Sequence, residues 1–211
     1  MADIFPVTAL VVPDGIQGLI FDCDGTLADT LTLHYIAWKQ SFAELGLPCP
    51  LAFMIQHNGK PTELIVSLYN EEFKQNVDTV KFTKKKEQLA YALLEKTRPL
   101  EPVAAVARFY HHRLPMAVVS GSNRRNVERA LQSAGLLDLF SVVLTADDGF
   151  PPKPNARLFL EAAHRLGVSP AACQVFEDAD SGLEGARCAG MLATDVRPFG
   201  GGWSSIERDL I

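Results

Sequence analysis

Five short apolar runs stand out along the chain, and each of them ends in polar residues. They cover residues 18–22, 116–120, 141–145, 173–177 and 191–196. Runs that are apolar on both faces are typical of strands in a parallel sheet, because helices cover both sides of such a sheet. The pattern therefore predicts a parallel sheet built from these five runs.

Helical periodicity fills the gaps between the later strands. Helices are expected at residues 124–134, 155–166 and 181–189. Each is followed directly by a glycine (Gly135, Gly167 and Gly190), the residue that most often ends a helix in a left-handed conformation. The alternation of strand and helix from about residue 100 onward predicts an α/β fold with a doubly wound, Rossmann-like core.

The segment between the first two strands breaks this alternation. Its helix-like stretches lie at residues 31–45, 62–70 and 79–96, and no convincing strand separates them. An all-helical insertion at this place predicts a cap domain over residues 31–98 on an α/β catalytic core of residues 1–30 and 99–211. The two junctions, near Thr30 and near Arg98, are then expected to act as hinges.

Two polar or flexible stretches predict no chemistry of their own. The run formed by Lys81, Lys84, Lys85 and Lys86 is expected to form a solvated helix face. The glycines at 200–202 predict a flexible turn, because no strand and helix flank them as in a phosphate-binding loop.

Composition and charge narrow the class of partner. The chain has 211 residues, of which 47% are hydrophobic and 21% charged, as in a soluble globular protein with one sizeable core. Its formal net charge of −5 argues against nucleic acid as a partner. A phosphorylated ligand would therefore need local cations or a metal ion.

Compartment and assembly are expectations of the same kind. No segment reaches the length of a transmembrane helix, so we expect no membrane partner. Four scattered cysteines (Cys23, Cys49, Cys173 and Cys188) lack the spacing of a zinc site or a disulfide framework and fit a reducing compartment. We expect a cytoplasmic monomer, and the role of Cys23 is open.

Polar side chains follow several of the expected strands at their carboxyl ends. Asp22 and Asp24 follow the first strand, Ser120 the second and Glu177–Asp178 the fourth, and Lys153 lies in the loop after the third. Because the carboxyl ends of parallel strands meet at one edge of a sheet, these groups are expected to converge there.

The spacing of Asp22 and Asp24 suggests a division of labour. Side chains at i and i+2 of an extended segment point the same way, and two close carboxylates repel unless a cation lies between them. With Asp178 they form an oxygen cluster suited to Mg²⁺. One carboxylate can attack phosphorus while the other exchanges a proton with the leaving oxygen and with water. Asp-Gly is also common in solvated turns, but here it follows an apolar strand.

Further groups at this edge can hold a phosphate. Lys153 offers a positive charge and Ser120 a hydroxyl donor. Gly25 lets the chain turn with its N–H toward the phosphate. The backbone of Gly121, Ser122 and Asn123 opens the next helix, where free N–H groups and the helix dipole favour an anion. Each of these features is weak evidence for a function when taken alone, since serine and asparagine are ordinary helix caps. Together they favour phosphoryl transfer.

These residues carry a resemblance to a known family. The segment FDCDGTLADT at 21–30, together with Ser120, Lys153 and Glu177–Asp178, resembles the haloacid dehalogenase-like hydrolases over about residues 15–196. The helical insertion looks like the cap of the β-phosphoglucomutase branch. The stretches HNGKPTEL, PMAVVSGS and VFEDADSGLEGARCAGM look most like bacterial fructose-1-phosphate phosphatases.

The resemblance implies a role for each core residue. Asp22 would be the nucleophile and Asp24 the general acid and base, while Ser120 and Lys153 would bind the phosphoryl group. The ligands of Mg²⁺ would be the Asp22 carboxylate, the Asp24 backbone carbonyl and Asp178, with Glu177 supporting them from behind. The substrate would be a small phosphorylated metabolite.

The resemblance also marks residues of the cap. Thr30, His34 and Trp38 share one helix face at the hinge, although His34 and Trp38 could equally be packed in the core. The loop Asn58, Gly59 and Lys60 matches a cap loop that often meets the substrate in the family.

Alternatives remain open at this point. A β-phosphoglucomutase shares His34, but Thr62 stands where such mutases have an arginine for the distal phosphate, which favours simple hydrolysis. A phospho-receiver domain would have no helical insertion and would need a stable phospho-aspartate. A haloacid dehalogenase proper would not need the magnesium ligands. A binding protein without catalysis would be expected to have lost a motif residue.

Overall fold

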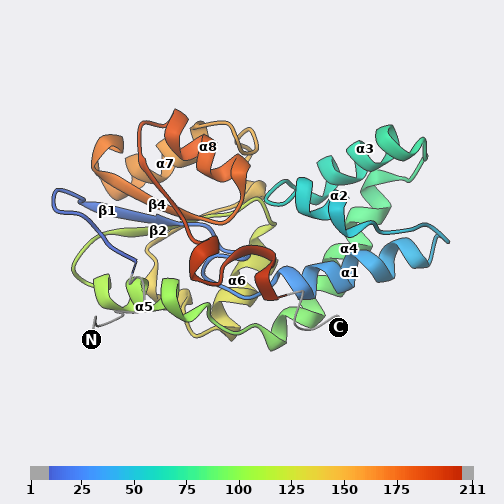
Figure 1. The fold of residues 1–211 in the computed structure, drawn as a ribbon, viewed down its shortest axis with the longest axis horizontal. Coiled ribbons are helices and arrows are strands. Elements are labelled where there is room, and N and C mark those ends of the chain that lie inside the picture. The colour runs from blue at the N-terminus through green and yellow to red at the C-terminus, as the bar shows by residue number, and fades with distance from the viewer. Residues whose placement is uncertain (1–9, 206–211) are drawn as a thin grey trace, which may run out of the picture.

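The chain forms a five-stranded parallel sheet with helices on both faces and a further group of helices beside it (Figure 1). The computed structural model describes residues 10–205. The strands are β1 Gly18–Phe21, β2 Met116–Val119, β3 Val142–Leu144, β4 Cys173–Glu177 and β5 Leu192–Asp195. Their order across the sheet is β3-β2-β1-β4-β5. The doubly wound α/β core with a helical cap is therefore confirmed.

Four helices cover the sheet. They are α5 Glu101–Tyr110, α6 Arg124–Ser133, α7 Arg157–Leu166 and α8 Asp180–Cys188. Figure 1 shows α7 and α8 on one side of the sheet and α5 and α6 on the other. Along β1, Leu19 and Phe21 belong to the apolar cluster that includes α5 and α6, whereas Ile20 belongs to the cluster of α7 and α8. Successive residues of a strand face opposite sides, which is why the central strand is apolar throughout.

The register of the central strands brings their ends to one level. Phe21, at the end of β1, lies opposite Val118 of β2 and Phe176 of β4. The rings of Phe21 and Phe176 are stacked with their centroids 4.9 Å apart. The residues that follow these three strands are therefore neighbours at the carboxyl edge, as expected for a doubly wound parallel sheet.

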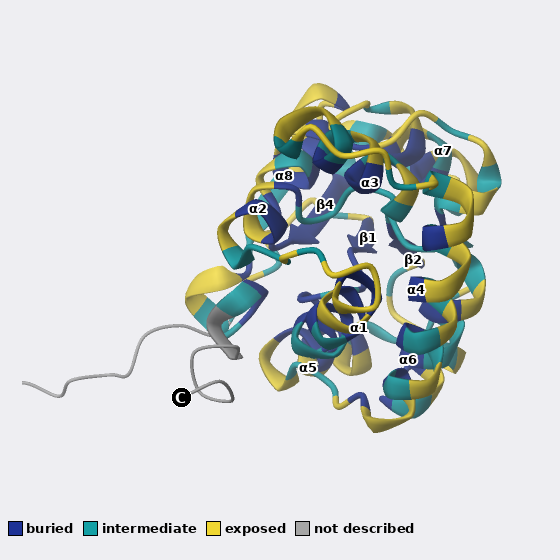
Figure 2. Ribbon diagram, turned by 90° about the vertical axis from the view of Figure 1, so that its right-hand side faces the viewer, coloured by how far each residue is buried: buried dark blue, intermediate teal, exposed yellow. Residues whose placement is uncertain are grey.

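The helical cap consists of four helices and a short 3₁₀ segment. They are α1 Leu31–Ala43, α2 Leu51–Gln56, α3 Thr62–Phe73, α4 Thr79–Leu93 and the 3₁₀ turn Leu94–Lys96. The cap has its own aromatic cluster, centred on Phe42, which is fully buried. Figure 2 looks onto this part of the molecule and shows buried residues on the inward sides of its helices. The division at 30/31 and 98/99 stays a prediction, and residues 1–9 and 206–211 of the expected core lie outside the described residues.

The two connections between sheet and cap run side by side. The N–H of Asp29 donates to the carbonyl of Arg98 (2.9 Å), and that of Leu100 donates to the carbonyl of Leu27 (2.9 Å). Ala28 and Pro99 form an antiparallel bridge between them. Both connections are thus tied to one another where they leave the core, at the places expected to act as hinges.

Two helices were not among those expected from the sequence. Helix α2 has 6 residues, too few for a helical period to be recognised. Helix α5 begins with Glu101 and Pro102, which are favourable in a first helical turn, but its alanines and valines give no sharp boundary. No helix in the described part of the chain has the length and apolar character that crossing a bilayer requires.

Phe42 provides a test of the cap's own core. Its ring lies 4.2 Å from that of Tyr69 and 4.5 Å from that of Phe82, centroid to centroid. Phe42→Ala is expected to lower the free energy of unfolding by about 3–5 kcal/mol, because the cavity left behind cannot close completely. Urea titration followed by circular dichroism measures the change. The matched control is Phe109→Ala, whose side chain is 55% exposed. Equal stability of the two variants would contradict the prediction.

Candidate active site

Asp22 lies directly after β1 at the centre of the carboxyl edge. Its Oδ1 accepts a hydrogen bond from Lys153 Nζ (2.7 Å), and its backbone N–H donates to the carbonyl of Phe176 (2.9 Å). Both side chains of the Asp22–Lys153 pair are buried. The loop after β3 thus places its lysine against the aspartate after β1, as expected from the convergence of strand ends.

Lys153 lies among three acceptors. Besides Asp22, its Nζ donates to Glu177 Oε1 (2.8 Å) and to the backbone carbonyl of Val119 (3.1 Å). A buried ammonium group is unfavourable unless it is paired and hydrogen-bonded, and here all three of its hydrogens can be used. Burial alone would lower the pKa of Lys153, but the charges of Asp22 and Glu177 outweigh burial and raise it. The lysine is therefore a permanent cation.

Asp22, Glu177 and Asp178 form a buried acidic cluster. One ligand atom from each of them can be chosen so that all lie within 4.8 Å of one another. Burial, followed by the charge of Glu177, raises the pKa of Asp22 well above its usual range. Three carboxylates face one ammonium group, so the cluster lacks positive charge. This excess of oxygen donors fits a divalent cation such as Mg²⁺.

Asp178 also has neighbours from the loop and from the cap. Its Oδ1 accepts from Thr26 Oγ1 (3.1 Å) and its Oδ2 from Asn58 Nδ2 (2.8 Å). Gly25, with φ of +81°, is the residue that this packing requires, since a Cβ there would lie 2.7 Å from Asp178 Oδ2. The predicted cap loop thus reaches the acidic cluster through Asn58.

Asp24 has its carboxylate among four donors. Its Oδ1 accepts from Thr30 Oγ1 (2.7 Å) and contacts His34 Nε2 (3.1 Å). Its Oδ2 accepts from Ser122 Oγ (2.7 Å) and Ser120 Oγ (3.3 Å). Burial would raise the pKa of Asp24, but the hydrogen bonds from His34, Ser122 and Thr30 outweigh burial and hold it well below its ordinary value. Asp24 is thus an ionised carboxylate in this arrangement.

A cavity of about 60 Å³ separates these groups from the cap. Its lining includes ten of the predicted residues: Asp22, Asp24, His34, Trp38, Asn58, Gly59, Lys60, Ser120, Gly121 and Ser122. Ligand pockets typically measure about 300–1,000 Å³, so this cavity is that of a closed cap. A Cβ on Gly121 would lie 2.2 Å from the carbonyl oxygen of Gly59, which shows how closely the cap loop approaches the core.

The other predicted residues lie behind the cavity wall. Thr30 positions Asp24, and Lys153 lies beneath Asp22. Asn123 is the N-cap of α6, and its side chain amide donates to Glu87 Oε2 (2.7 Å). The N–H of Ser122 donates to Ser120 Oγ (3.0 Å), so this N–H is already paired in the closed form.

Six residues of the lining were not among the predicted site residues, although the sequence analysis had singled out Thr62 for its place in the mutases. They are Leu31, Met54, Thr62, Ile65, Lys86 and Trp203. Lys86 corrects an expectation, because it is 3% exposed and not part of a solvated face. The spacing of Phe82, Lys86 and Ala90 was a usable signal, since positions four apart share one helix face and the outer two are apolar.

Trp203 reaches the cavity from the C-terminal segment. The N–H of Gly202 donates to the carbonyl of Gly25 (2.8 Å), and Gly201 and Gly202 are buried. The ring of Trp203 lies 6.1 Å from that of Tyr35 in the cap, centroid to centroid. The expected turn at 200–202 packs against the loop that carries Asp22 and Asp24, and its flexibility stays a prediction.

Comparison with known proteins identifies the family. The model of the haloacid dehalogenase-like hydrolase family matches residues 19–196, from β1 to the end of β5. The chain belongs to this family, which confirms the resemblance seen in its sequence. Membership and the phosphatase relatives also confirm the expected class of phosphoric monoester hydrolase.

Individual relatives share most of their length with this chain. Fructose-1-phosphate phosphatase YqaB of Escherichia coli K12 is 41% identical over 181 residues, covering 85% of this chain and 96% of that protein. A β-phosphoglucomutase of Bacillus subtilis 168 is 27% identical over 204 residues, covering 92% of this chain and 88% of that protein. The crystal structure of a hydrolase from Pseudomonas syringae shares the fold, with a TM-score of 0.77 at 22% identity over 91% of this chain and 90% of that one.

The acidic cluster generates a prediction about pH and metal binding. Burial and the charge of Glu177 raise the pKa of Asp178 to about 8 in the metal-free protein. The folded state then holds this proton more tightly than the unfolded chain, so the stabilisation it gives at low pH is lost as the pH rises from about 4 toward 8. In EDTA, Tm is expected to fall over this range, and Mg²⁺ is expected to raise Tm most at the alkaline end. Asp178→Asn should weaken both effects without abolishing them, because the raised pKa of Asp22 remains; a Tm of the wild-type protein that changes neither with pH nor with Mg²⁺ would contradict the prediction.

Gly182 on α8 gives a second test, of the position of Glu177. A Cβ at Gly182 would lie 1.6 Å from Glu177 Oε1, so Gly182→Ala must displace the carboxylate that contacts Lys153. We expect kcat/KM for phosphate-ester hydrolysis to fall by about a hundredfold, as for other displacements of about 1 Å near a site. Glu184→Ala, at an exposed position of the same helix, is the control. Unchanged activity of Gly182→Ala would show that Glu177 is not needed where it lies.

Proposed function

We propose that this protein is a magnesium-dependent phosphatase that hydrolyses a small sugar monophosphate, such as fructose 1-phosphate, through a phosphoryl group carried transiently on Asp22. The observation that carries the proposal is the placement of Asp22 against the Lys153 ammonium group and beside the carboxylates of Glu177 and Asp178, where it lines a cavity under the cap. The activity named for the relative that is 41% identical supports fructose 1-phosphate as the substrate.

The first half of the reaction forms the phospho-aspartate. A carboxylate oxygen of Asp22 attacks phosphorus, and the bond from phosphorus to the sugar oxygen breaks. Asp24, which carries the proton taken up from water in the preceding turnover, donates it to the departing oxygen, so that the sugar leaves as an alcohol. Lys153 keeps Asp22 oriented, and Ser120 and the loop after it donate hydrogen bonds to the phosphoryl oxygens.

The second half regenerates Asp22. Water attacks the phosphorus of the acyl phosphate, its proton passes to Asp24, and the bond between Asp22 and phosphorus breaks. The donors Thr30, His34 and Ser122 favour the ionised form of Asp24, which suits it as the base of this step. A magnesium ion held by the Asp22 carboxylate, the Asp24 backbone carbonyl and Asp178, with Glu177 behind them, would neutralise charge on the phosphoryl oxygens.

A mutase is the second candidate, because a β-phosphoglucomutase is among the relatives. A mutase needs a site for a second phosphate, because its bisphosphate intermediate has to reorient in the cavity before the second transfer. At the position where β-phosphoglucomutases have an arginine for the distal phosphate, Thr62 offers a hydroxyl and no charge. Lys86 beside it is paired with Glu87 (2.9 Å). These contacts favour hydrolysis over isomerisation.

The test is phosphate release from a panel of sugar phosphates in Mg²⁺. The wild-type protein is expected to release inorganic phosphate and to form no isomeric sugar phosphate. EDTA should abolish turnover and Mg²⁺ should restore it. Asp22→Asn is expected to lose activity entirely, because the amide cannot be phosphorylated, and Asp24→Asn should leave only slow turnover.

Trapping identifies the nucleophile. With beryllofluoride and Mg²⁺, a crystal structure is expected to show an adduct on Asp22. The control Asp138→Asn, at an exposed position, should retain full activity. Full activity of Asp22→Asn, or an adduct on another residue, would refute the mechanism.

A further inference from the structure

A carboxylate of the cap, Glu87 on α4, lies directly behind the cavity wall. Its side chain is 17% exposed. Its Oε1 accepts hydrogen bonds from Lys86 Nζ (2.9 Å) and from Thr62 Oγ1, and both of these residues line the cavity. Any influence of Glu87 on a bound ligand is therefore exerted through Lys86 and Thr62.

The second oxygen of Glu87 joins the cap to the core. Its Oε2 accepts from the side chain amides of Asn123 (2.7 Å) and Asn126. Asn123 in turn caps α6, since its Oδ1 accepts from the backbone N–H of Asn126 (3.0 Å). Helix α6 follows the loop of Ser120 and Ser122, so Glu87 fixes the cap against the element that supplies two of the donors around Asp24.

The Lys86–Glu87 pair makes this end of the cavity electrically neutral. An isolated ammonium or carboxylate group would be unfavourable at this depth, and each is the partner of the other. Burial would raise the pKa of Glu87, but the charge of Lys86 and the hydrogen bonds from Thr62 and Lys86 outweigh burial and lower it. Glu87 therefore carries a full negative charge at neutral pH and cancels that of Lys86.

The pair is also connected to the general acid and base. Lys86 Nζ lies 3.1 Å from His34 Nδ1, and an ammonium group can only donate, so Nδ1 accepts. The ring proton of His34 is then on Nε2, which donates to Asp24 Oδ1 (3.1 Å). Glu87 is thus connected to Asp24 through two residues, Lys86 and His34.

We propose that Glu87 is a positioning residue that sets the choice of substrate: it holds Lys86 and Thr62 as a neutral, hydrogen-bonding surface for sugar hydroxyls and thereby excludes substrates with a second phosphate. A second phosphate at the far end of the sugar would meet a lysine whose charge is already cancelled, with a carboxylate behind it. The inference rests on the proposed function, since it concerns the same cavity.

The experiment compares kcat/KM for fructose 1-phosphate and fructose 1,6-bisphosphate at saturating Mg²⁺. The wild-type protein is expected to prefer the monophosphate. Glu87→Gln keeps the shape of the side chain but frees the charge of Lys86, and should lower this preference about tenfold or more. Lys86→Gln leaves Glu87 without its cation and should raise the preference. Opposite shifts of the substrate preference in these two variants indicate selection by charge, because a loosened cap would lower kcat/KM for both substrates alike.

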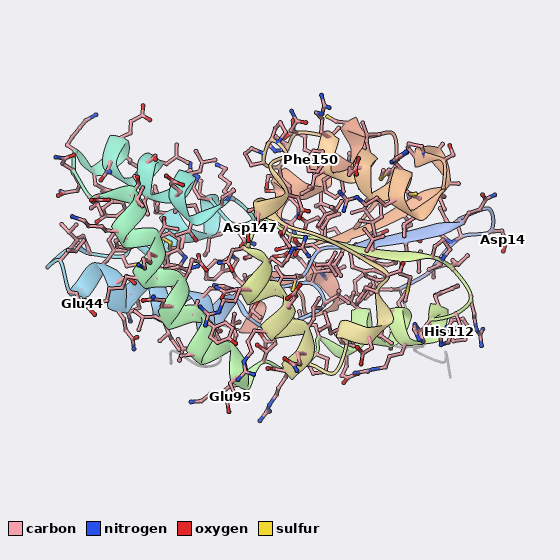
Figure 3. All side chains as sticks on the ribbon, turned by 180° about the vertical axis from the view of Figure 1, so that it is seen from behind. Asp14, Glu44, Glu95, His112, Asp147 and Phe150 are labelled. Atoms are coloured by element: carbon pink, nitrogen blue, oxygen red, sulfur yellow. The ribbon has the colours of Figure 1, made fainter. Side chains whose placement is uncertain are left out.

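Glu95→Gln is the matched control. Glu95 also joins the cap to α6, through Arg129 Nη2 (3.0 Å), but it is exposed and lies at the outer edge of the molecule, as Figure 3 shows. The preference of the Glu95→Gln variant for fructose 1-phosphate should equal that of the wild-type protein.

Three outcomes would overturn the inference about Glu87 alone. The first is equal hydrolysis of both sugar phosphates by the wild-type protein. The second is a substrate preference that shifts in the same direction in Glu87→Gln and Lys86→Gln. The third is an unchanged substrate preference in Glu87→Gln. If circular dichroism shows Glu87→Gln to be unfolded, the direction of the shift in Lys86→Gln decides. Phosphate release from neither sugar by the wild-type protein would overturn the proposed function and this inference together.

Discussion

The structure of the site depends on one buried ammonium group, that of Lys153. It holds Asp22 and Glu177 at hydrogen-bond distance although both carboxylates are buried and repel one another. Removing one partner of such a group leaves the others uncompensated, which costs several kcal/mol in typical proteins. One positive charge against three carboxylates also leaves the cluster incomplete. The same arrangement that holds the proposed nucleophile, Asp22, in place therefore leaves an acidic cluster that fits a divalent cation.

The cap completes the site in the same way, by supplying partners to groups of the core. Asn58 contacts Asp178, His34 contacts Asp24 and Glu87 contacts the start of α6. Each of these contacts joins residues more than nine positions apart and crosses from the helical part to the sheet edge. The proposed catalytic groups thus have all of their partners only when the cap lies against the sheet edge.

The sequence predicted the five strands because each is a short apolar run that ends in polar residues, and β1, β2 and β4 are buried along their whole length. It predicted the residues at the strand ends because topology places them at one edge. It failed where the deciding partner is distant in the sequence. Lys86 looks like one of four solvated lysines until Glu87, Thr62 and His34 are known to surround it. Trp203 follows three glycines, and their ordered packing arises from contacts with residues almost the whole chain away.

The hydrogen bond between Gly202 and Gly25 has a consequence for the synthesis of the protein on the ribosome. The loop that carries Asp22 and Asp24 is synthesised long before Asp178 and Gly202, yet it packs on both of them. Strand β1 itself lies between β2 and β4 and cannot be enclosed before β4 exists. During synthesis on the ribosome, Asp22 is therefore present long before the partners that complete the proposed site. We expect phosphatase activity only after the residues through Gly202 have emerged.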